Sequence, residues 1–263
     1  MRILFIGDVV GEPGCSMLQS SLPNLRTTYQ PDVIIVNGEN SASDGRGITP
    51  SIVQDIIGQG VHLITSGNHI WAKKEIVDFF RAGTKHLLRP ANYPGDCPGS
   101  GVAIIPLPDG RKLGVMNLMG RVFMHDHLDC PFRAAASLLT YIRTQTPYVF
   151  VDFHAETTSE KYALAYYLDG KVSAVVGTHT HVQTADEQIL PHGTAYITDV
   201  GMGGARHSSL GMKSDIIIQK FISQMPVRFS VEQSKPWILS AVCIELLPSG
   251  LAQKITRILI QQS

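Results

Sequence analysis

The sequence of 263 residues contains only four cysteines, and they lie far apart. None of them forms a C-x-x-C pair, so neither a disulfide framework nor a zinc site made of thiolates is expected. No segment reaches the ~18 consecutive apolar residues that a membrane-spanning helix needs. The first residues, MRILFIGDVVGEPG, lack the basic start and long apolar stretch of a secretion signal. We therefore expect a cytoplasmic protein that does not contact a membrane.

The sequence also lacks an excess of either charge, internal repeats, low-complexity tracts and a flexible linker. Lysine and arginine together number 22, as do aspartate and glutamate. This balance gives no strong signal for nucleic-acid binding. With 44% hydrophobic residues the chain can bury a full core, and we expect a single domain over residues 1–263. The number of subunits cannot be read from these features, which are compatible with a homo-oligomer.

Short runs rich in valine and isoleucine, bounded by glycine, proline, asparagine and aspartate, recur along the chain. Their length and their boundaries predict buried strands. They lie at 2–7, 32–37, 61–65, 102–107, 112–118, 148–153, 172–177, 194–200, 238–247 and 252–260.

Helical segments and hairpin turns separate these predicted strands. Thr49-Pro50 has the composition of a helix start, with a capping hydroxyl followed by proline. Helical spacing is found at 13–28, 132–145, 159–168 and 213–224. Hairpin turns are predicted at 109–110, 191–193 and 248–250. Because crossovers are mixed with hairpins, the expected class is α/β with two mixed sheets.

Side chains able to bind a metal follow five of the predicted strands, at the point where each strand ends. They are Asp8, Glu39 with Asn40, Asn68 with His69, His154, and His179 with His181. Ligand sites in open α/β sheets gather at the carboxyl ends of strands, so these residues converge if the strands are neighbours. A set of oxygen and nitrogen ligands without sulfur suits Mn, Fe, Zn, Ni or Mg. The two-residue spacing of His179 and His181 places both on one side of an extended chain, where each can serve one of two adjacent ions.

Each of these residues has an ordinary structural explanation when it is considered alone. Asp8 could cap the following helix, and Asn40 and Asn68 could be turn residues. His69 and His154 could be buried imidazoles that bond to nearby protein groups. Five such coincidences, each at a strand end, would be needed together, so the joint interpretation as a metal site is favoured.

At these residues the sequence resembles the calcineurin-like metallophosphoesterases, whose signature consists of short blocks in a fixed order. The blocks are GDVVG at Asp8, NGEN at Glu39 and Asn40, SGNHIW at Asn68 and His69, VDFHAE at His154, and GTHTH at His179 and His181. They span about two thirds of the chain. Their particular form closely resembles the YmdB-like branch, whose members look like bacterial phosphodiesterases acting on cyclic nucleotides.

The resemblance implies a four-layer α-β-β-α sandwich that holds two metal ions, iron or manganese, and no organic cofactor. It implies one ion bound by Asp8, Glu39, Asn40 and His181, and a second bound by Glu39, Asn68, His154 and His179, so that Glu39 bridges them. A hydroxide bridging the two ions would attack phosphorus, and His69 would protonate the departing oxygen as general acid. The expected substrate is a small cyclic nucleotide, with 2′,3′-cyclic AMP favoured.

Three positions depart from the usual superfamily pattern and leave other functions open. Val10 stands where a histidine is usual, Glu39 where an aspartate is usual, and Ile70 where an acidic residue is usual. The YmdB-like branch resembles this chain at Val10 and Glu39, and there Asn40 replaces the lost contact. One alternative is a phosphomonoesterase or protein phosphatase with the same metal site. A second alternative is a regulatory protein that binds metal or nucleotide and has weak catalysis.

Two loops carry weaker candidates for substrate binding. The loop at 201–211, GMGGARHSSLG, contains Arg206 and His207, and its glycines would let backbone N–H groups approach an anion. A flexible lid or an ordinary loop before a helix explains that composition equally well. The loop at 41–49 follows Glu39 and Asn40, which favours a position facing the substrate. No residue is assigned to base recognition, because single aromatic residues are more often part of the core.

Overall fold

The computed structural model describes residues 1–262, which form two mixed β-sheets. The first sheet has the order β2-β11-β12-β1-β3-β4, and β13 pairs with β12. Its strands are β1 (Arg2–Ile6), β2 (Asp8–Val9), β3 (Val33–Asn37), β4 (Leu63–Thr65), β11 (Met202–Ala205), β12 (Trp237–Leu246) and β13 (Ala252–Gln262). β1, β3 and β4 are parallel neighbours, whereas β12 runs antiparallel to β1, β11 and β13.

The second sheet has the order β5-β6-β7-β8-β10-β9. Its strands are β5 (Val102–Pro106), β6 (Lys112–Met119), β7 (Val149–His154), β8 (Ala174–Thr178), β9 (Gln188–Ile189) and β10 (Ala195–Ile197). The four central strands are parallel, and the two edge strands are antiparallel to their neighbours. The predicted α/β class with two mixed sheets is therefore confirmed.

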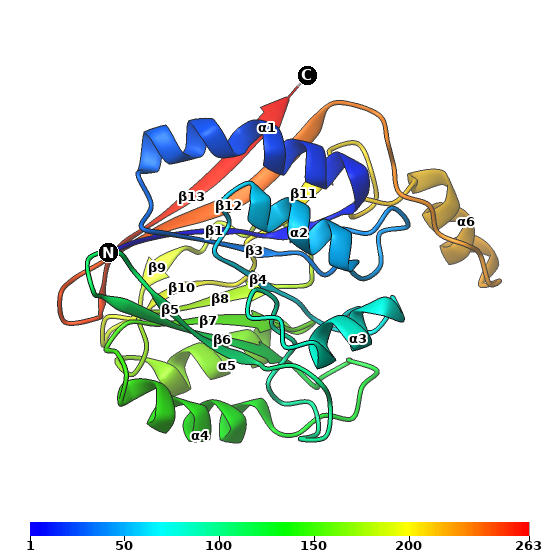
Figure 1. Ribbon diagram of the computed structural model, residues 1–263. Coiled ribbons are helices and arrows are strands. Elements are labelled where there is room, and N and C mark those ends of the chain that lie inside the picture. The colour runs from blue at the N-terminus through cyan, green and yellow to red at the C-terminus, as the bar shows by residue number, and fades with distance from the viewer. Residues whose placement is uncertain (263) are drawn as a thin grey trace.

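The two sheets pack face to face, and helices cover their outer faces (Figure 1). Side chains alternate along each strand, so β1 sends Phe5 into the core between the sheets and Leu4 into the core beneath the helices. Phe5 meets Phe150 of β7 across the gap, with ring centroids 5.2 Å apart. Asn37 and Asp152 have the same alternation as these inward residues, so their polar groups also lie between the sheets.

The six helices of residues 1–262 are α1 (Gly11–Tyr29), α2 (Pro50–Gly58), α3 (Glu75–Arg81), α4 (Pro131–Arg143), α5 (Thr158–Leu168) and α6 (Ser214–Ser223). α1 and α2 pack on the first sheet, α3 contacts α2, and α4 and α5 pack on the second sheet. The predicted start of α2 is confirmed, because the hydroxyl of Thr49 accepts a hydrogen bond from the backbone N–H of Ile52. α6 has no buried residue and projects from the body (Figure 1). None of the six helices combines the length and apolar character that a membrane-spanning segment needs.

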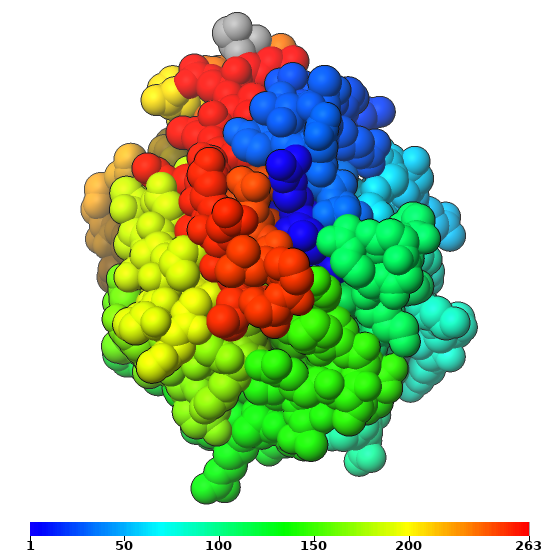
Figure 2. All heavy atoms as spheres, turned by 90° about the vertical axis from the view of Figure 1, so that its left-hand side faces the viewer, coloured from blue at the N-terminus to red at the C-terminus, as the bar shows by residue number. Residues whose placement is uncertain are grey.

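All three predicted hairpins are present, as β5–β6, β9–β10 and β12–β13. The turn between β12 and β13 joins distant parts of the chain: Ala252 donates its backbone N–H to Gly193, and the Tyr148 hydroxyl donates to Pro248. Figure 2 shows this end of the molecule, where the orange and red C-terminal segment lies between yellow and green segments. The face in Figure 2 carries the N-terminus, whereas the candidate site lies at the other ends of β1 and β3.

The first half of the glycine-rich segment at 201–211 differs from the flexible lid or loop that its composition suggests, whereas its second half is a loop that leads to α6. Residues Met202–Ala205 form the buried strand β11, which pairs with β2 on one side and β12 on the other. Because β2 and β9 are only two residues long, and α3 only seven, they carry too little periodicity to be predicted.

A close approach between β8 and β10 requires glycine at position 177. A Cβ atom there would overlap the backbone carbonyl of Thr198, the residue that directly follows β10. We expect Gly177→Ala to lower the free energy of unfolding by about 1–3 kcal/mol, because the backbone must shift to relieve the overlap. Thermal unfolding followed by circular dichroism measures this change.

Gly58→Ala is the matched control, because Gly58 ends α2 and a Cβ there meets no atom within 4 Å. Alanine should leave the stability there unchanged or raise it slightly. Equal melting temperatures for the two variants would contradict the close-packing argument.

Candidate metal centre

The eight polar residues predicted from the strand ends lie together where the two sheets meet. β1, β3 and β4 are parallel in the first sheet, and β7 and β8 are parallel in the second, so their carboxyl ends share one side of the molecule. The residues brought together are Asp8, Glu39, Asn40, Asn68, His69, His154, His179 and His181.

His154, the last residue of β7, lies at the centre of this group and is fully buried. Three atoms lie within 3.1 Å of its Nε2: Glu39 Oε1, Asn68 Oδ1 and His179 Nδ1. One ligand atom each from Glu39, His154 and His179 lie within 4.8 Å of one another, a spacing that could hold a metal ion. Glycine at position 67 permits this approach, because a Cβ there would overlap the imidazole of His154.

The other half of the group is formed by Asp8, Asn40 and His181. Oδ2 of the buried Asp8 accepts a hydrogen bond from the backbone N–H of His179 at 3.2 Å. Oδ1 of Asp8 has no hydrogen-bond partner among residues 1–262 and lies 3.9 Å from Nε2 of His181. That same nitrogen lies 3.1 Å from the side-chain nitrogen of Asn40. An unpartnered buried carboxylate oxygen is costly, and a cation beside it would remove that cost.

Each of the three histidines uses one ring nitrogen on a protein acceptor and turns the other toward this group. The acceptors are Thr178 Oγ1 for Nδ1 of His154 at 3.0 Å, Glu156 Oε2 for Nε2 of His179 at 2.9 Å, and the Leu210 carbonyl for Nδ1 of His181 at 3.0 Å. Such acceptors fix the tautomer and the orientation of metal-binding histidines. The nitrogens that remain, together with the carboxylate and amide oxygens, fit the ligand preferences of a divalent metal.

The charges in the group favour a proton on His154 when no cation is bound. Burial opposes a charged imidazole, but the Glu39 and Asp8 carboxylates outweigh it and raise the pKa of His154 to about 9. Burial likewise opposes the charge of Glu39, and the imidazoles of His154 and His69 hold the pKa of Glu39 well below its usual value. Burial and the nearby His154 lower the pKa of His179 to about 3, so this ring is neutral.

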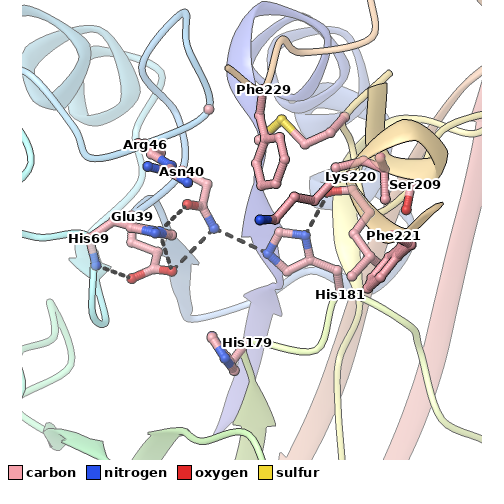
Figure 3. Close-up of a pocket in the computed structure, with 14 residues that line it drawn as sticks. Glu39, Asn40, Arg46, His69, His179, His181, Ser209, Lys220, Phe221 and Phe229 are labelled. Carbon is pink, nitrogen blue, oxygen red and sulfur yellow. Dashed lines mark hydrogen bonds and ion pairs between the residues drawn. The ribbon is translucent and has the colours of Figure 1, made fainter. Parts of the chain in front are cut away.

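His69 stands at the edge of the group, on the wall of a cavity (Figure 3). Its Nδ1 lies 2.8 Å from Asn40 Oδ1, and its backbone N–H donates to Glu39 Oε2 at 3.2 Å. Its side chain is 31% exposed, unlike the buried His154. Nε2 is therefore the ring nitrogen left for a molecule in the cavity.

His179 and His181 reach the group by a different route from the one that their spacing predicts. The strand β8 ends at Thr178, so the alternation of an extended chain does not apply to them. Both residues have a positive φ, 94° and 62°, which turns the backbone sharply between them. The prediction that an extended chain places both histidines on one side is therefore wrong, although both side chains do reach the group.

A buried ion pair that the sequence does not reveal holds this sharp turn. Lys161 of α5 donates to Asp199 Oδ2 at 2.9 Å, and both side chains are almost fully buried. The same carboxylate oxygen accepts the backbone N–H of Thr180 at 3.0 Å and its hydroxyl at 2.6 Å. Because Thr180 lies between His179 and His181, the pair fixes the peptide that carries both imidazoles.

Another buried carboxylate, that of Asp152, lies beneath the ligands and joins the two sheets. It accepts hydrogen bonds from Asn37 and Thr65 of the first sheet and, at 2.8 Å, from the hydroxyl of Thr178 in the second. Since Thr178 donates to Asp152, its oxygen accepts from Nδ1 of His154. The only sequence signal for this role is an aspartate inside the apolar run YVFVDF.

The two weaker substrate candidates, Arg206 and His207, do not line the cavity beside the metal ligands. The guanidinium of Arg206 contacts the side chain of Gln261 instead. Arg206 is the first residue after β11. From the other predicted loop, Gly45 and Arg46 do line the cavity.

The chain is similar over its whole length to known proteins. The sequence profile of the YmdB-like protein family matches residues 4–258. A 2′,3′-cyclic-nucleotide 2′-phosphodiesterase from Bacillus subtilis is 52% identical over 261 residues, which cover 99% of this chain and 97% of that protein.

Two solved structures have the same fold over almost every residue. The crystal structure of a hypothetical protein from Thermus thermophilus covers 100% of both chains at 40% identity, with a TM-score of 0.92. The crystal structure of a novel phosphatase from Mycoplasma pneumoniae covers 99% of this chain and 93% of that one at 33% identity, with a TM-score of 0.91. The match of the family profile and the near-complete overlap with the B. subtilis protein show that this chain belongs to the YmdB-like protein family.

Proposed function

We propose that this protein is a metal-dependent phosphoric diester hydrolase that acts on small cyclic nucleotides. The observation that carries the proposal is the arrangement of three imidazoles, each held by a protein acceptor on one nitrogen and open toward Asp8 and Glu39 on the other. The activity named for the B. subtilis relative, at 52% identity, supports a cyclic phosphodiester as the substrate.

The proposed site would hold two metal ions, and Glu39 would belong to both sets of ligands. Asp8, Glu39, Asn40 and His181 would hold one ion. Glu39, Asn68, His154 and His179 would hold the other. The unpartnered oxygen of Asp8 and the three possible ligand atoms around Nε2 of His154 support this division. Iron and manganese are proposed because both accept mixed oxygen and nitrogen ligands.

When bound, the ions would supply positive charge beside the phosphate oxygens and lower the pKa of water at the site. The residues of the chain orient the substrate and move a proton. In the reaction a water oxygen adds to phosphorus, the bond from phosphorus to O2′ of the ribose breaks, and O2′ takes up a proton. His69 would donate that proton from Nε2, since Asn40 holds its Nδ1. The product would be a nucleoside 3′-phosphate, and 2′,3′-cyclic AMP is the proposed substrate.

A phosphomonoesterase is the second candidate, because the M. pneumoniae structure with a TM-score of 0.91 is named a phosphatase. The same ligands would serve both reactions, so the substrate must decide between them. A cytoplasmic location remains part of the proposal, supported by four free cysteines in the described chain, as is usual in a reducing compartment.

The His69→Ala variant tests the role of the general acid. We expect kcat for 2′,3′-cyclic AMP to fall about 10²- to 10⁴-fold, because the departing oxygen then leaves without a positioned proton. The metal content by elemental analysis should stay unchanged, since His69 is not among the proposed ligands. His192→Ala alters a histidine in the β9–β10 turn and serves as the control.

The assay should include 3′,5′-cyclic AMP, bis-p-nitrophenyl phosphate and p-nitrophenyl phosphate. Turnover of the monoester alone would favour the phosphomonoesterase. An absence of turnover for every diester, with two metal ions bound, would rule out the proposed function.

The Thr178→Val variant tests the acceptor that orients His154. Valine has nearly the shape of threonine but cannot accept from Nδ1, so we expect the affinity for Mn²⁺ to fall about 10- to 100-fold. Calorimetric titration of the metal-free protein measures the affinity. Thr146→Val removes a buried hydroxyl that donates to Lys112 outside the site, and it should leave Mn²⁺ affinity unchanged. Equal affinities in the two variants would show that Thr178 does not act through His154.

Metal affinity should depend on pH in a defined direction. The pKa of His154 is raised to about 9, so its Nε2 carries a proton at pH 7 that a metal ion must displace. Burial also raises the pKa of Asp8, which acts in the same direction. We expect the apparent Kd for Mn²⁺ to fall about tenfold between pH 7 and pH 8. Calorimetry in buffers with different ionisation enthalpies counts the protons released, and a count of zero at pH 7 would contradict the expectation.

A further inference from the structure

A cavity of about 340 Å³ opens beside the metal ligands and extends toward α6. Its inner end is lined by Glu39, Asn40, His69, His179 and His181. Its outer end is lined by the apolar side chains of Leu210, Met212, Ile217, Phe221 and Phe229. Figure 3 shows Phe229 and Phe221 on the side opposite His69. The volume falls within the ~300–1,000 Å³ that is usual for small-molecule sites, and one end is polar while the other is apolar.

Backbone hydrogen bonds hold the outer wall of the cavity, residues 209–213 and 229–231, in a defined conformation. Met212 forms isolated β-bridges with Ser209 and Val231, and the backbone N–H of Lys213 donates to Ser230 at 2.9 Å. Phe229 is therefore adjacent to a fixed strand-like pairing. The Leu210 carbonyl that accepts from His181 belongs to the same wall, so the wall is joined to a proposed metal ligand.

Two cations line the cavity between its two ends. Arg46 comes from the loop after β3, and Lys220 comes from α6. Among residues 1–262 no carboxylate forms an ion pair with the side chain of either cation. The guanidinium carbon of Arg46 lies 5.7 Å from the ring centroid of Phe229. Positive charge next to an aromatic face is the combination that binds a phosphate attached to a flat ring.

The outer end combines half-buried apolar side chains, among them Phe229, with two exposed ones, Leu210 and Phe221. Phe221 is 73% exposed, and α6 buries none of its residues against the body. A flat aromatic ligand would cover this surface and stack on a phenylalanine ring. Apart from the Ser209 hydroxyl, the outer side chains offer no hydrogen-bonding group that could distinguish one base from another.

We propose that the outer end of this cavity binds the nucleobase of the substrate, with the base stacked on Phe229. Arg46 and Lys220 would face the phosphate and the ribose, which reach from the base to the metal ligands. The site would favour purines by their larger stacking area and would distinguish adenine from guanine only weakly. This inference rests on the proposed function, because it assigns the remainder of the same substrate.

The test compares two substrates that share the five-membered cyclic phosphodiester, of which only the first carries a ribose ring and a base. They are 2′,3′-cyclic AMP and glycerol 1,2-cyclic phosphate, assayed with the Mn²⁺-loaded full chain. We expect Phe229→Ala to lower kcat/KM for 2′,3′-cyclic AMP about ten- to hundredfold, mainly through KM, and to leave glycerol cyclic phosphate unchanged. Ile222→Ala is the matched control, since Ile222 is an 80% exposed apolar residue of α6 that does not line the cavity.

Equal losses of kcat/KM on both substrates, or a loss on neither, would overturn the proposed base site. A change of oligomeric state in both Phe229→Ala and Ile222→Ala, without selective loss on the nucleotide, would also overturn it in favour of a contact between copies of this chain.

Binding measurements separate failure of this inference from failure of the proposed function. If the wild-type protein turns over neither substrate, the hydrolase proposal fails. The base site is then judged from the affinity for adenosine 3′-monophosphate relative to glycerol phosphate. A weaker affinity of Phe229→Ala for the nucleotide alone would support the site, and an unchanged affinity would reject it.

Discussion

A buried carboxylate between the two sheets links their packing to the position of the ligand group. Asp152 accepts hydrogen bonds from Asn37 and Thr65 on one sheet and from Thr178 on the other. Burial raises its pKa to about 7, although the hydrogen bonds from Thr65 and Thr178 oppose the shift. A polar group in this position is stable only if its partners stay in place, so the register of the two sheets and the direction of His154 are linked.

The three proposed histidine ligands are oriented in the same way, each by one contact with the protein. One nitrogen of His154, His179 and His181 contacts a protein acceptor, Thr178, Glu156 or the Leu210 carbonyl, and the other points into the ligand group. The ion pair of Lys161 and Asp199 adds a second level, because it fixes a peptide in a conformation that non-glycine residues rarely adopt. Rigid support of this kind keeps the ligands in place in the absence of a metal ion.

The sequence alone predicts the two mixed sheets, the three hairpins and the eight residues that gather at the strand ends. These follow from local patterns: apolar runs, turn dipeptides and a polar residue directly after each strand. Asp152 and Asp199 escaped prediction because their partners lie far away in the sequence and meet them only through the fold. The exposure of α6 was not predicted for another reason. Its apolar spacing predicts a helix correctly, but the same spacing is usual for a helix that packs on a core.

The connection between β11 and β12 carries the outer wall of the cavity, and one hydrogen bond joins it to the ligand group. β11 ends at Ala205 and β12 begins at Trp237, and these two residues pair directly as antiparallel neighbours. The residues between them, including α6 and Phe229, form one long connection that leaves the sheet at the end of β11 and returns at the start of β12. An insertion, a deletion or an exchange of this segment would leave every strand of both sheets in place. Relatives could therefore acquire new substrate preferences by remodelling this segment, provided that the carbonyl at position 210 still accepts from His181.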